Sequence, residues 1–506
     1  MSRTSKSIKN IIIAGISQVF LTVISFIARK IFIVFLNAEY LGINGLFTSI
    51  LTVLSLAELG LGPAMTFSLY KPLAQKDYSL CATLMRFYQK TYRIIGIAVL
   101  IIGICITPFL SYFIKEIPKG VDNISIIYVM FVVNTAISYF YAYKRLAITA
   151  SQNQYIIESV HVFSKVAMNV AQIIILMLTQ NYMLFLTVQI ISTIVENIIL
   201  SKWADNKFEW TGLTGSKVLP TDKKREISRN IRAMIFHRIG GVIVDSIDNL
   251  LISKYFGLLF LGVYSNYLLI INGINSFINP VFSGMLASIG DFGVQKDNNE
   301  KYRLYKNIQF INFWIVSFCT VCLFCLADQF VGQIWLSEDY TMDLSVKIVI
   351  VLNFYITGMR KTVLTFKEAL GLPWYDRYKP LLAALVNLVF SIILAKTFGV
   401  IGVFIGTTIA NLGVNVWYEA FVLFKHGFGK NLLPFISLYV KQFVVMIVIT
   451  VLTVALTSII DLSGIAGFLV NIIVCLIVPN IIMVALFFKK REFRYIMQLA
   501  GSIIKK

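Results

Sequence analysis

Long apolar runs constrain this chain more than any other feature. They recur along the whole of its 506 residues, each near the length of about 20 residues that a helix needs to cross a hydrocarbon core about 30 Å thick. With 58% hydrophobic and 14% charged residues, the sequence is too apolar for a soluble globular domain. Runs such as Ile94 to Ile106 lack the strict alternation of barrel strands. We therefore predict an all-α polytopic membrane protein.

About fourteen transmembrane helices are predicted. Their ranges are 11–36, 42–67, 94–114, 124–143, 156–178, 183–201, 233–253, 258–288, 308–330, 345–360, 380–397, 399–424, 434–458 and 465–488.

The basic residues fall almost entirely in alternate loops, so the net charge of +20 indicates membrane topology rather than nucleic-acid binding. They form clusters at Arg3 to Lys9, at Lys217 to Arg232, at Lys361, Lys367, Arg377 and Lys379, and at Lys489 to Arg494. The opposite loops carry only Lys115, Lys119, Lys254 and Lys396. The positive-inside rule predicts that both termini lie in the cytoplasm. We expect a multi-pass protein of the cytoplasmic (inner) membrane.

The polar interval 202–232 is predicted to be a cytoplasmic linker between two six-helix lobes. Tyr40-Leu41-Gly42 in the first half resembles Phe260-Leu261-Gly262 in the second. Transporters built from two related bundles show such weak repeats and hold the substrate between the bundles. The predicted organisation is an N-lobe at 1–201, the linker at 202–232, a C-lobe at 233–424, and two additional helices with a basic cytoplasmic tail at 425–506.

Polar residues inside the spans are spaced three or four apart, so that each set shares one helix face. A charge in the bilayer centre costs about 2.5 to 3.5 kcal/mol, and such charges face protein or a water-filled cavity. The predicted substrate-binding residues are Arg29, Glu58, Lys165, Arg238, Asp245 and Asp248. The predicted uncharged cavity-lining residues are Gln18, Thr22, Ser25, Asn44, Thr48, Ser55, Asn272, Ser276 and Asn279.

These polar residues also have a structural interpretation, which the sequence leaves open. Uncharged side chains commonly join helices by hydrogen bonds in bilayers, and Arg238 with Asp245 could be a structural ion pair. We expect Glu196 and Glu419 to be partners within the helix bundle, and Lys347 and Lys441 to reach water.

No catalytic motif stands out, and we predict a protein that is not an enzyme and has no cofactor. His161, His237 and His426 lie far apart and make no metal-ligand spacing, so no metal site is expected. The cysteines at 319, 322 and 325 lie within one span and read as packing residues. No disulfide and no cleavable signal peptide are expected.

Several motifs resemble those of the polysaccharide (oligosaccharide) flippases of the multidrug/oligosaccharidyl-lipid/polysaccharide exporter superfamily. The resemblance covers nearly the whole chain, and its motifs are Tyr40-Leu41-Gly42, Ala57 to Gly62, Asp248-Asn249 through Gly257, Gly262 to Tyr267, Ser288 to Gly290, and Phe398 to Gly402 with Gly406-Thr407. The resemblance implies two six-helix lobes around a central cavity lined by helices one, two, seven and eight. It also implies alternating access and two further helices that form a lipid-facing groove in some relatives.

The function expected from these features is translocation of a polyprenyl-diphosphate-linked oligosaccharide across the membrane for surface polysaccharide assembly. The expected partners are this lipid-linked substrate, membrane lipids and other polysaccharide-assembly proteins, without nucleic acid. One alternative is a cation-coupled multidrug exporter of the same superfamily. Another is a membrane glycan polymerase, although the external loops around 115–123 and 331–343 look short for its active site.

Overall fold

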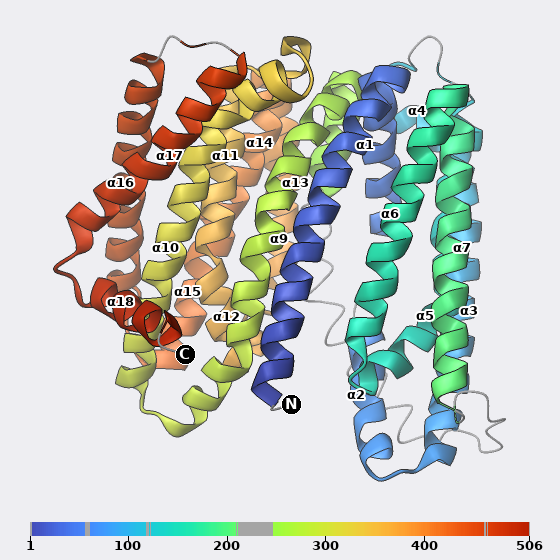
Figure 1. Ribbon diagram of the computed structural model, residues 1–506, viewed down its shortest axis with the longest axis horizontal. Helices are drawn as coiled ribbons and strands as arrows, with labels where there is room; N and C mark the ends of the chain where they lie inside the picture. Colours follow the sequence, from blue (N-terminus) through green and yellow to red (C-terminus); the bar gives the residue numbers. More distant parts are fainter. Residues whose placement is uncertain are drawn as a thin grey trace. The chain divides into compact units, whose positions relative to one another are not determined.

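The computed structural model describes residues 3–55, 61–117, 121, 123–208, 210, 246–459, 462 and 464–504. Within these ranges every regular element is a helix and no strand occurs (Figure 1). Twelve of these helices are long and apolar enough to cross a membrane. The prediction of an all-α polytopic membrane protein is confirmed. The chain divides into two compact units, Met1–Gly262 and Val263–Lys506, and each is described by itself.

The N-terminal unit is built from long helices around an aromatic core. Its labelled elements are α1 Arg3–Leu54, α2 Leu61–Ala74, α3 Tyr78–Ile106, η2 Thr107–Phe109, α4 Leu110–Phe113, α5 Ile124–Ala150, α6 Gln154–Thr179 and α7 Tyr182–Lys207. Helix α5 packs against α3 and α7, and α6 packs against α1 and α7. The buried rings of Tyr88, Tyr92 and Tyr139 lie in the core between α3 and α5.

The C-terminal unit is arranged around α10. Its elements are α9 Leu258–Gln295 (which begins in the N-terminal unit), α10 Asn298–Gln329, η4 Phe330–Trp335, η5 Glu338–Tyr340, α11 Leu344–Met359, α12 Lys361–Ala369, η6 Pro373–Asp376, α13 Lys379–Phe398, α14 Val400–Ala410, η7 Asn411–Val416, α15 Trp417–Val422, η8 Leu423–Phe428, α16 Leu433–Ile459, α17 Gly464–Phe487 and α18 Arg491–Ile504.

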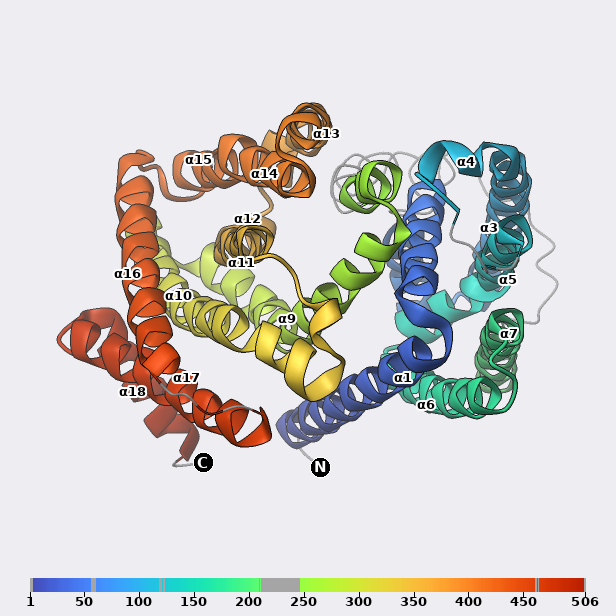
Figure 2. The ribbon, with the colours of Figure 1, turned by 90° about the horizontal axis from the view of Figure 1, so that it is seen from above.

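Helix α10 contacts α11, α16 and α17 (Figure 2). The two additional helices predicted after the C-lobe are therefore α16 and α17, packed on α10. The predicted basic tail includes a further helix, α18, which also packs on α10. There Phe493 stacks on Trp314 with ring centroids 5.9 Å apart.

The twelve spanning helices overlap thirteen of the fourteen predicted spans, because the first one, Gln18–Leu54, covers most of 11–36 and the beginning of 42–67. The end of 42–67 lies in α2. The remaining span, 233–253, lies mostly outside the described residues, as do residues 211–232 of the predicted linker. The predicted boundaries of lobes and linker stay predictions.

Helix α1 bends at Asn37, between the first two predicted spans. Asn37 adopts φ 67° and ψ 176°, a left-handed φ that asparagine tolerates better than most residues. Its side-chain Oδ1 accepts a hydrogen bond from the backbone N–H of Glu39 at 3.0 Å, as a helix N-cap does. The bend therefore has a local cause in the sequence.

The repeated Leu-Gly motif marks a reciprocal close contact within the N-terminal unit. A Cβ atom on Gly42 would lie 2.0 Å from the carbonyl oxygen of Leu258, and one on Gly262 would lie 1.9 Å from that of Ala38. The two glycines are equivalent positions of the predicted repeat, and so are the two residues that present the carbonyls. The two segments therefore cross with local two-fold symmetry, and glycine is needed at each crossing because a side chain would overlap the facing backbone.

Substitution of Gly42 by alanine is expected to destabilise the protein by about 1 to 3 kcal/mol, the usual cost of overpacking a close contact. The measurement is thermal unfolding of the detergent-purified protein. Gly45→Ala is the matched control, because a Cβ there would lie 3.6 Å from the Leu261 side chain, an ordinary contact distance. Equal unfolding temperatures for the two variants would contradict the close contact.

Candidate functional site

The polar stripe predicted on the eighth span lies on α9. Asn272 and Asn279 are exposed and Ser276 is half-buried. The Ser276 hydroxyl donates to the carbonyl of Gly273 at 2.6 Å, which leaves the two amides as the groups on this stripe that can reach other helices. A fourth member, Asn275, lies one turn before Asn279 and shares its face.

Lys361 of α12 binds to this face of α9. Its Nζ donates to Asn275 Oδ1 at 2.8 Å and to Asn279 Oδ1 at 2.7 Å. Among the described residues no carboxylate pairs with this half-buried ammonium. An ammonium has three N–H donors, and the two amides use two of them. The arrangement is a positive charge held in place by neutral acceptors, and it can attract an anion without first breaking an ion pair.

Sequence reasoning assigned Lys361 to a cytoplasmic loop cluster, and the structure corrects this. The predicted tenth span ended at residue 360, whereas the spanning helix continues through α12 to Ala369. Arg360 and Lys361 end the apolar run, but Arg360 keeps helical backbone angles and α12 follows it directly. Lys367 and Lys379, assigned to the same loop cluster, are buried as well.

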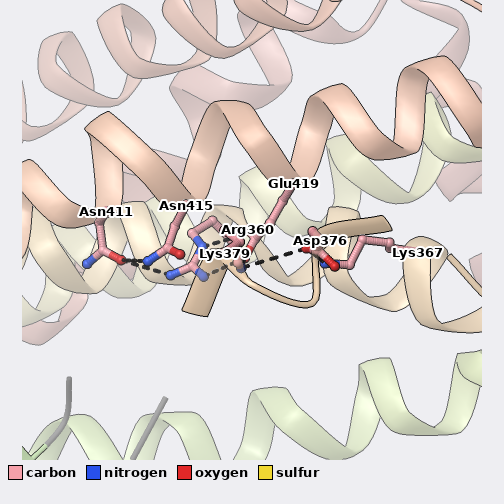
Figure 3. Close-up of polar contacts among 7 residues, drawn as sticks. All are labelled: Arg360, Lys367, Asp376, Lys379, Asn411, Asn415 and Glu419. Carbon is pink, nitrogen blue, oxygen red and sulfur yellow. Dashed lines mark hydrogen bonds and ion pairs between the residues drawn. The ribbon is translucent and has the colours of Figure 1, made fainter. Parts of the chain in front are cut away.

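Buried charges next to this site hold four elements together (Figure 3). Glu419 of α15 has no exposed side-chain surface and accepts two hydrogen bonds from Arg360, at 2.7 and 3.0 Å. Lys379 of α13 also pairs with Glu419. Arg360 further donates to Asn411 Oδ1 of η7 at 2.9 Å. The bundle role expected for Glu419 thus has a specific set of partners.

A second buried pair continues the network. Lys367 of α12 pairs with Asp376 of η6, and Lys379 Nζ lies 4.0 Å from the same carboxylate. Three cations and two carboxylates therefore share this region, and its net charge is positive. Because Arg360 directly precedes Lys361, the network fixes the backbone from which Lys361 projects.

The stripe predicted on the first span lies on α1, where Gln18, Thr22, Ser25 and Arg29 are all half-buried. The hydroxyls of Thr22 and Ser25 donate to the carbonyls of Gln18 and Leu21, at 2.8 and 2.7 Å. Their donors are therefore used within the helix, and their oxygens remain as acceptors.

The second-span residues have mixed surroundings. Asn44 is half-buried and Thr48 is exposed, while the Ser55 hydroxyl donates to the Leu51 carbonyl at 2.7 Å. Glu58 lies outside the described residues.

The remaining charged candidates are only partly described. Asp248 is buried in the N-terminal unit, and its neighbour Asn249 donates to Ser49 Oγ at 2.9 Å. Lys165 is exposed on α6, whereas Arg238 and Asp245 lie outside the described residues. The substrate-binding roles assigned to all of these residues remain predictions.

The N-terminal unit also has a carboxylate held by two basic groups. Glu196 Oε1 of α7 accepts from Arg145 of α5 at 2.9 Å and lies 3.2 Å from Nδ1 of His161 on α6. Arg145 also donates to Asn197 Oδ1 at 3.0 Å. The expected bundle role of Glu196 therefore joins three helices.

No protein-family model and no curated protein matches the sequence, but solved structures match its fold. The lipid II flippase MurJ in an inward closed conformation matches with a TM-score of 0.62 at 14% identity, over 94% of this chain and 98% of that chain. An inward-facing multidrug resistance MATE family transporter of the MOP superfamily matches with a TM-score of 0.58 at 14% identity, over 78% and 91%. The Vibrio cholerae MATE transporter VcmN matches with a TM-score of 0.51 at 14% identity, over 85% and 99%.

These likenesses show that the chain has the all-α fold of multi-pass membrane transporters. The family to which the sequence motifs pointed stays a prediction.

Proposed function

We propose that this protein moves a lipid-linked oligosaccharide from one membrane leaflet to the other by alternating access, in the cytoplasmic membrane with both termini inside. The observation that carries the proposal is the Lys361 ammonium, held by Asn275 and Asn279 on the polar face of α9. A fold shared with a lipid II flippase and with multidrug transporters supports the transport class. The sequence motifs support the polysaccharide branch, and with it surface polysaccharide assembly alongside other assembly proteins.

The chemical problem for such a transporter is a diphosphate with several sugars, which would lose their hydration in hydrocarbon at a large cost. A cationic group with a donor directed at phosphate oxygen replaces part of that hydration. Lys361 supplies the charge, and the neighbouring amides of α9 offer donors and acceptors to sugar hydroxyls. The polyprenyl chain stays in the lipid.

Within this proposal the N-terminal unit supplies the remaining cations. Arg29 and Arg238 attract the diphosphate, and Lys165 adds positive charge. Glu58, Asp245 and Asp248 orient these groups or bind a coupling ion, and the uncharged stripes of α1 and α9 meet the sugars.

Outward transfer of about two negative charges is favoured by an inside-negative potential, by about 2.3 kcal/mol per charge for each 100 mV. In vesicles reconstituted with the protein and a fluorescent polyprenyl-diphosphate glycan, collapse of the potential is therefore expected to slow flipping several-fold. Protein-free vesicles are the control. Flipping that is insensitive to the potential would argue against this drive.

A cation-coupled multidrug exporter is the second candidate, and the matches to MATE transporters favour it. The two functions give opposite phenotypes. Deletion of a flippase removes surface glycan, and its overexpression leaves drug susceptibility unchanged. Raised drug resistance on overexpression, together with normal glycan on deletion, would favour the exporter.

A further inference from the structure

Each compact unit contains a carboxylate bound by an arginine and by a second base. In the N-terminal unit these are Glu196, Arg145 and His161. In the C-terminal unit they are Glu419, Arg360 and Lys379. We call these the N-triad and the C-triad.

The two triads occupy corresponding places in the sequence repeat. Arg145 follows the fourth predicted span, and Arg360 ends the tenth. The second bases lie near the start of the fifth and eleventh spans. The carboxylates lie within the sixth and twelfth spans. The separation along the chain between the members of each pair is close to that between Gly42 and Gly262 of the Leu-Gly motif.

A hydrogen bond between neighbouring helices supports this correspondence. Gln172 Nε2 of α6 donates to the Phe185 carbonyl of α7 at 3.2 Å. Ser391 Oγ of α13 donates to the Val403 carbonyl of α14 at 3.0 Å. The two donors, and likewise the two acceptors, are separated along the chain by nearly the same interval as the repeated glycines, so both helix pairs use equivalent positions.

The triads differ in the second base, and the difference has a chemical consequence. Lysine keeps its charge at physiological pH, whereas an imidazole gains or loses a proton between about pH 5 and 8. At physiological pH the C-triad therefore has two cations and one carboxylate. The N-triad reaches the same charge only when His161 binds a proton.

The surroundings of His161 allow that proton to enter. Its side chain is 42% exposed, and that of Glu196 only 11%, so water reaches the imidazole more easily than the carboxylate. On its own helix Glu158 and Lys165 lie within about one turn. Helix α5 contributes Arg145 and α7 contributes Glu196, while the Lys144–Asp205 pair joins the same two helices nearer the end of α7. Between residue 18 and its bend, α1 carries Arg29 and Lys30 as its charged residues.

We propose that the N-triad is a proton-binding site and that its occupancy sets the rate of transport. The imidazole takes one proton from water on the face predicted to be cytoplasmic, and the imidazolium then pairs with the Glu196 carboxylate. Proton binding adds an ion pair between α6 and α7, and loss of the proton weakens the attachment of α6. The proton-binding part stands on the geometry alone, and only its link to transport rests on the proposed function.

The first test measures proton binding without any substrate. In the purified full-length protein with ¹⁵N-labelled histidine, the His161 signal is assigned by its loss in His161→Gln, and its shift is followed with pH. Replacement of Glu196 by glutamine removes the carboxylate that pairs with the imidazolium, so the pH dependence of the His161 signal is expected to differ between this variant and the wild type. A His161 signal that does not respond to pH, or that responds identically in Glu196→Gln, would overturn the proton site.

The second test measures transport in vesicles between about pH 5.5 and 8 on the side facing the N-triad. The wild-type rate is expected to change by about two- to fivefold, the range available to one partly exposed ion pair. His161→Lys copies the C-triad and is expected to make the rate independent of pH.

His426→Gln is the matched control, because the His426 ring stacks on Tyr375 at 3.9 Å and belongs to neither triad. This variant keeps the wild-type pH profile. A His161→Lys variant that also keeps that profile would overturn the link to transport, while the titration would still decide whether the triad binds a proton.

Discussion

Replacement of Lys361 by alanine lowers transport of the lipid-linked substrate about 10- to 100-fold, the loss expected for one hydrogen bond to a charged group. The effect is large because the ammonium is held by Asn275 and Asn279 and has no carboxylate partner among the described residues. Its charge is thus directed to a ligand rather than to the fold. The measurement is flipping in reconstituted vesicles, with the amount of folded protein determined by size-exclusion chromatography.

Two further variants make this result specific. Lys430 donates to Asn299 Oδ1 at 3.0 Å on an exposed surface, so Lys430→Ala removes the same kind of contact and is expected to transport normally. Lys361→Arg keeps the charge with a different donor geometry, and it retains more activity than the alanine variant. Wild-type transport by Lys361→Ala would remove this residue from the mechanism.

Replacement of Glu419 by glutamine is expected to cost about 3 to 5 kcal/mol of stability, because Arg360 loses this buried carboxylate partner and Lys379 keeps only the carboxylate of Asp376, 4.0 Å away. The expected result is a much lower unfolding temperature and a low yield of folded protein in the membrane. The measurement is thermal unfolding followed by tryptophan fluorescence.

The control is an ion pair of the same chemistry at the surface. Glu300 lies 3.3 Å from Lys296, and both side chains are about half exposed, so Glu300→Gln is expected to change stability by less than about 1 kcal/mol. The triple variant Arg360→Met, Lys379→Met and Glu419→Leu removes all three charges together. It is expected to recover much of the stability lost in Glu419→Gln. A stable Glu419→Gln protein would show that the network does not hold these helices.

The sequence located one side of the candidate site but not the other. Asn272, Ser276 and Asn279 were placed on one face of one helix, because residues three or four apart on a helix share a face. Asn275 and Lys361 were missed as members of the site. Lys361 was missed because charge, read as a loop signal, ended the predicted span before the helix itself ended.

For the buried charges, too, the sequence predicted one part and missed another. The sequence indicated that Glu196 and Glu419 would find partners within a bundle, since an unpaired charge is costly in a membrane. It could not name Arg145, His161, Arg360 or Lys379 as those partners.

The sequence by itself determined a multi-pass helical membrane protein and the order of its spans, and it placed polar residues on one face of several helices. These properties depend on local backbone geometry and on transfer of side chains into hydrocarbon, and both can be read along the chain. The tertiary structure decided which polar groups meet. Lys361 lies 86 and 82 residues from its two amide partners, and Arg360 lies 59 residues from Glu419. Contacts at such separations depend on how whole helices pack, which no local pattern specifies.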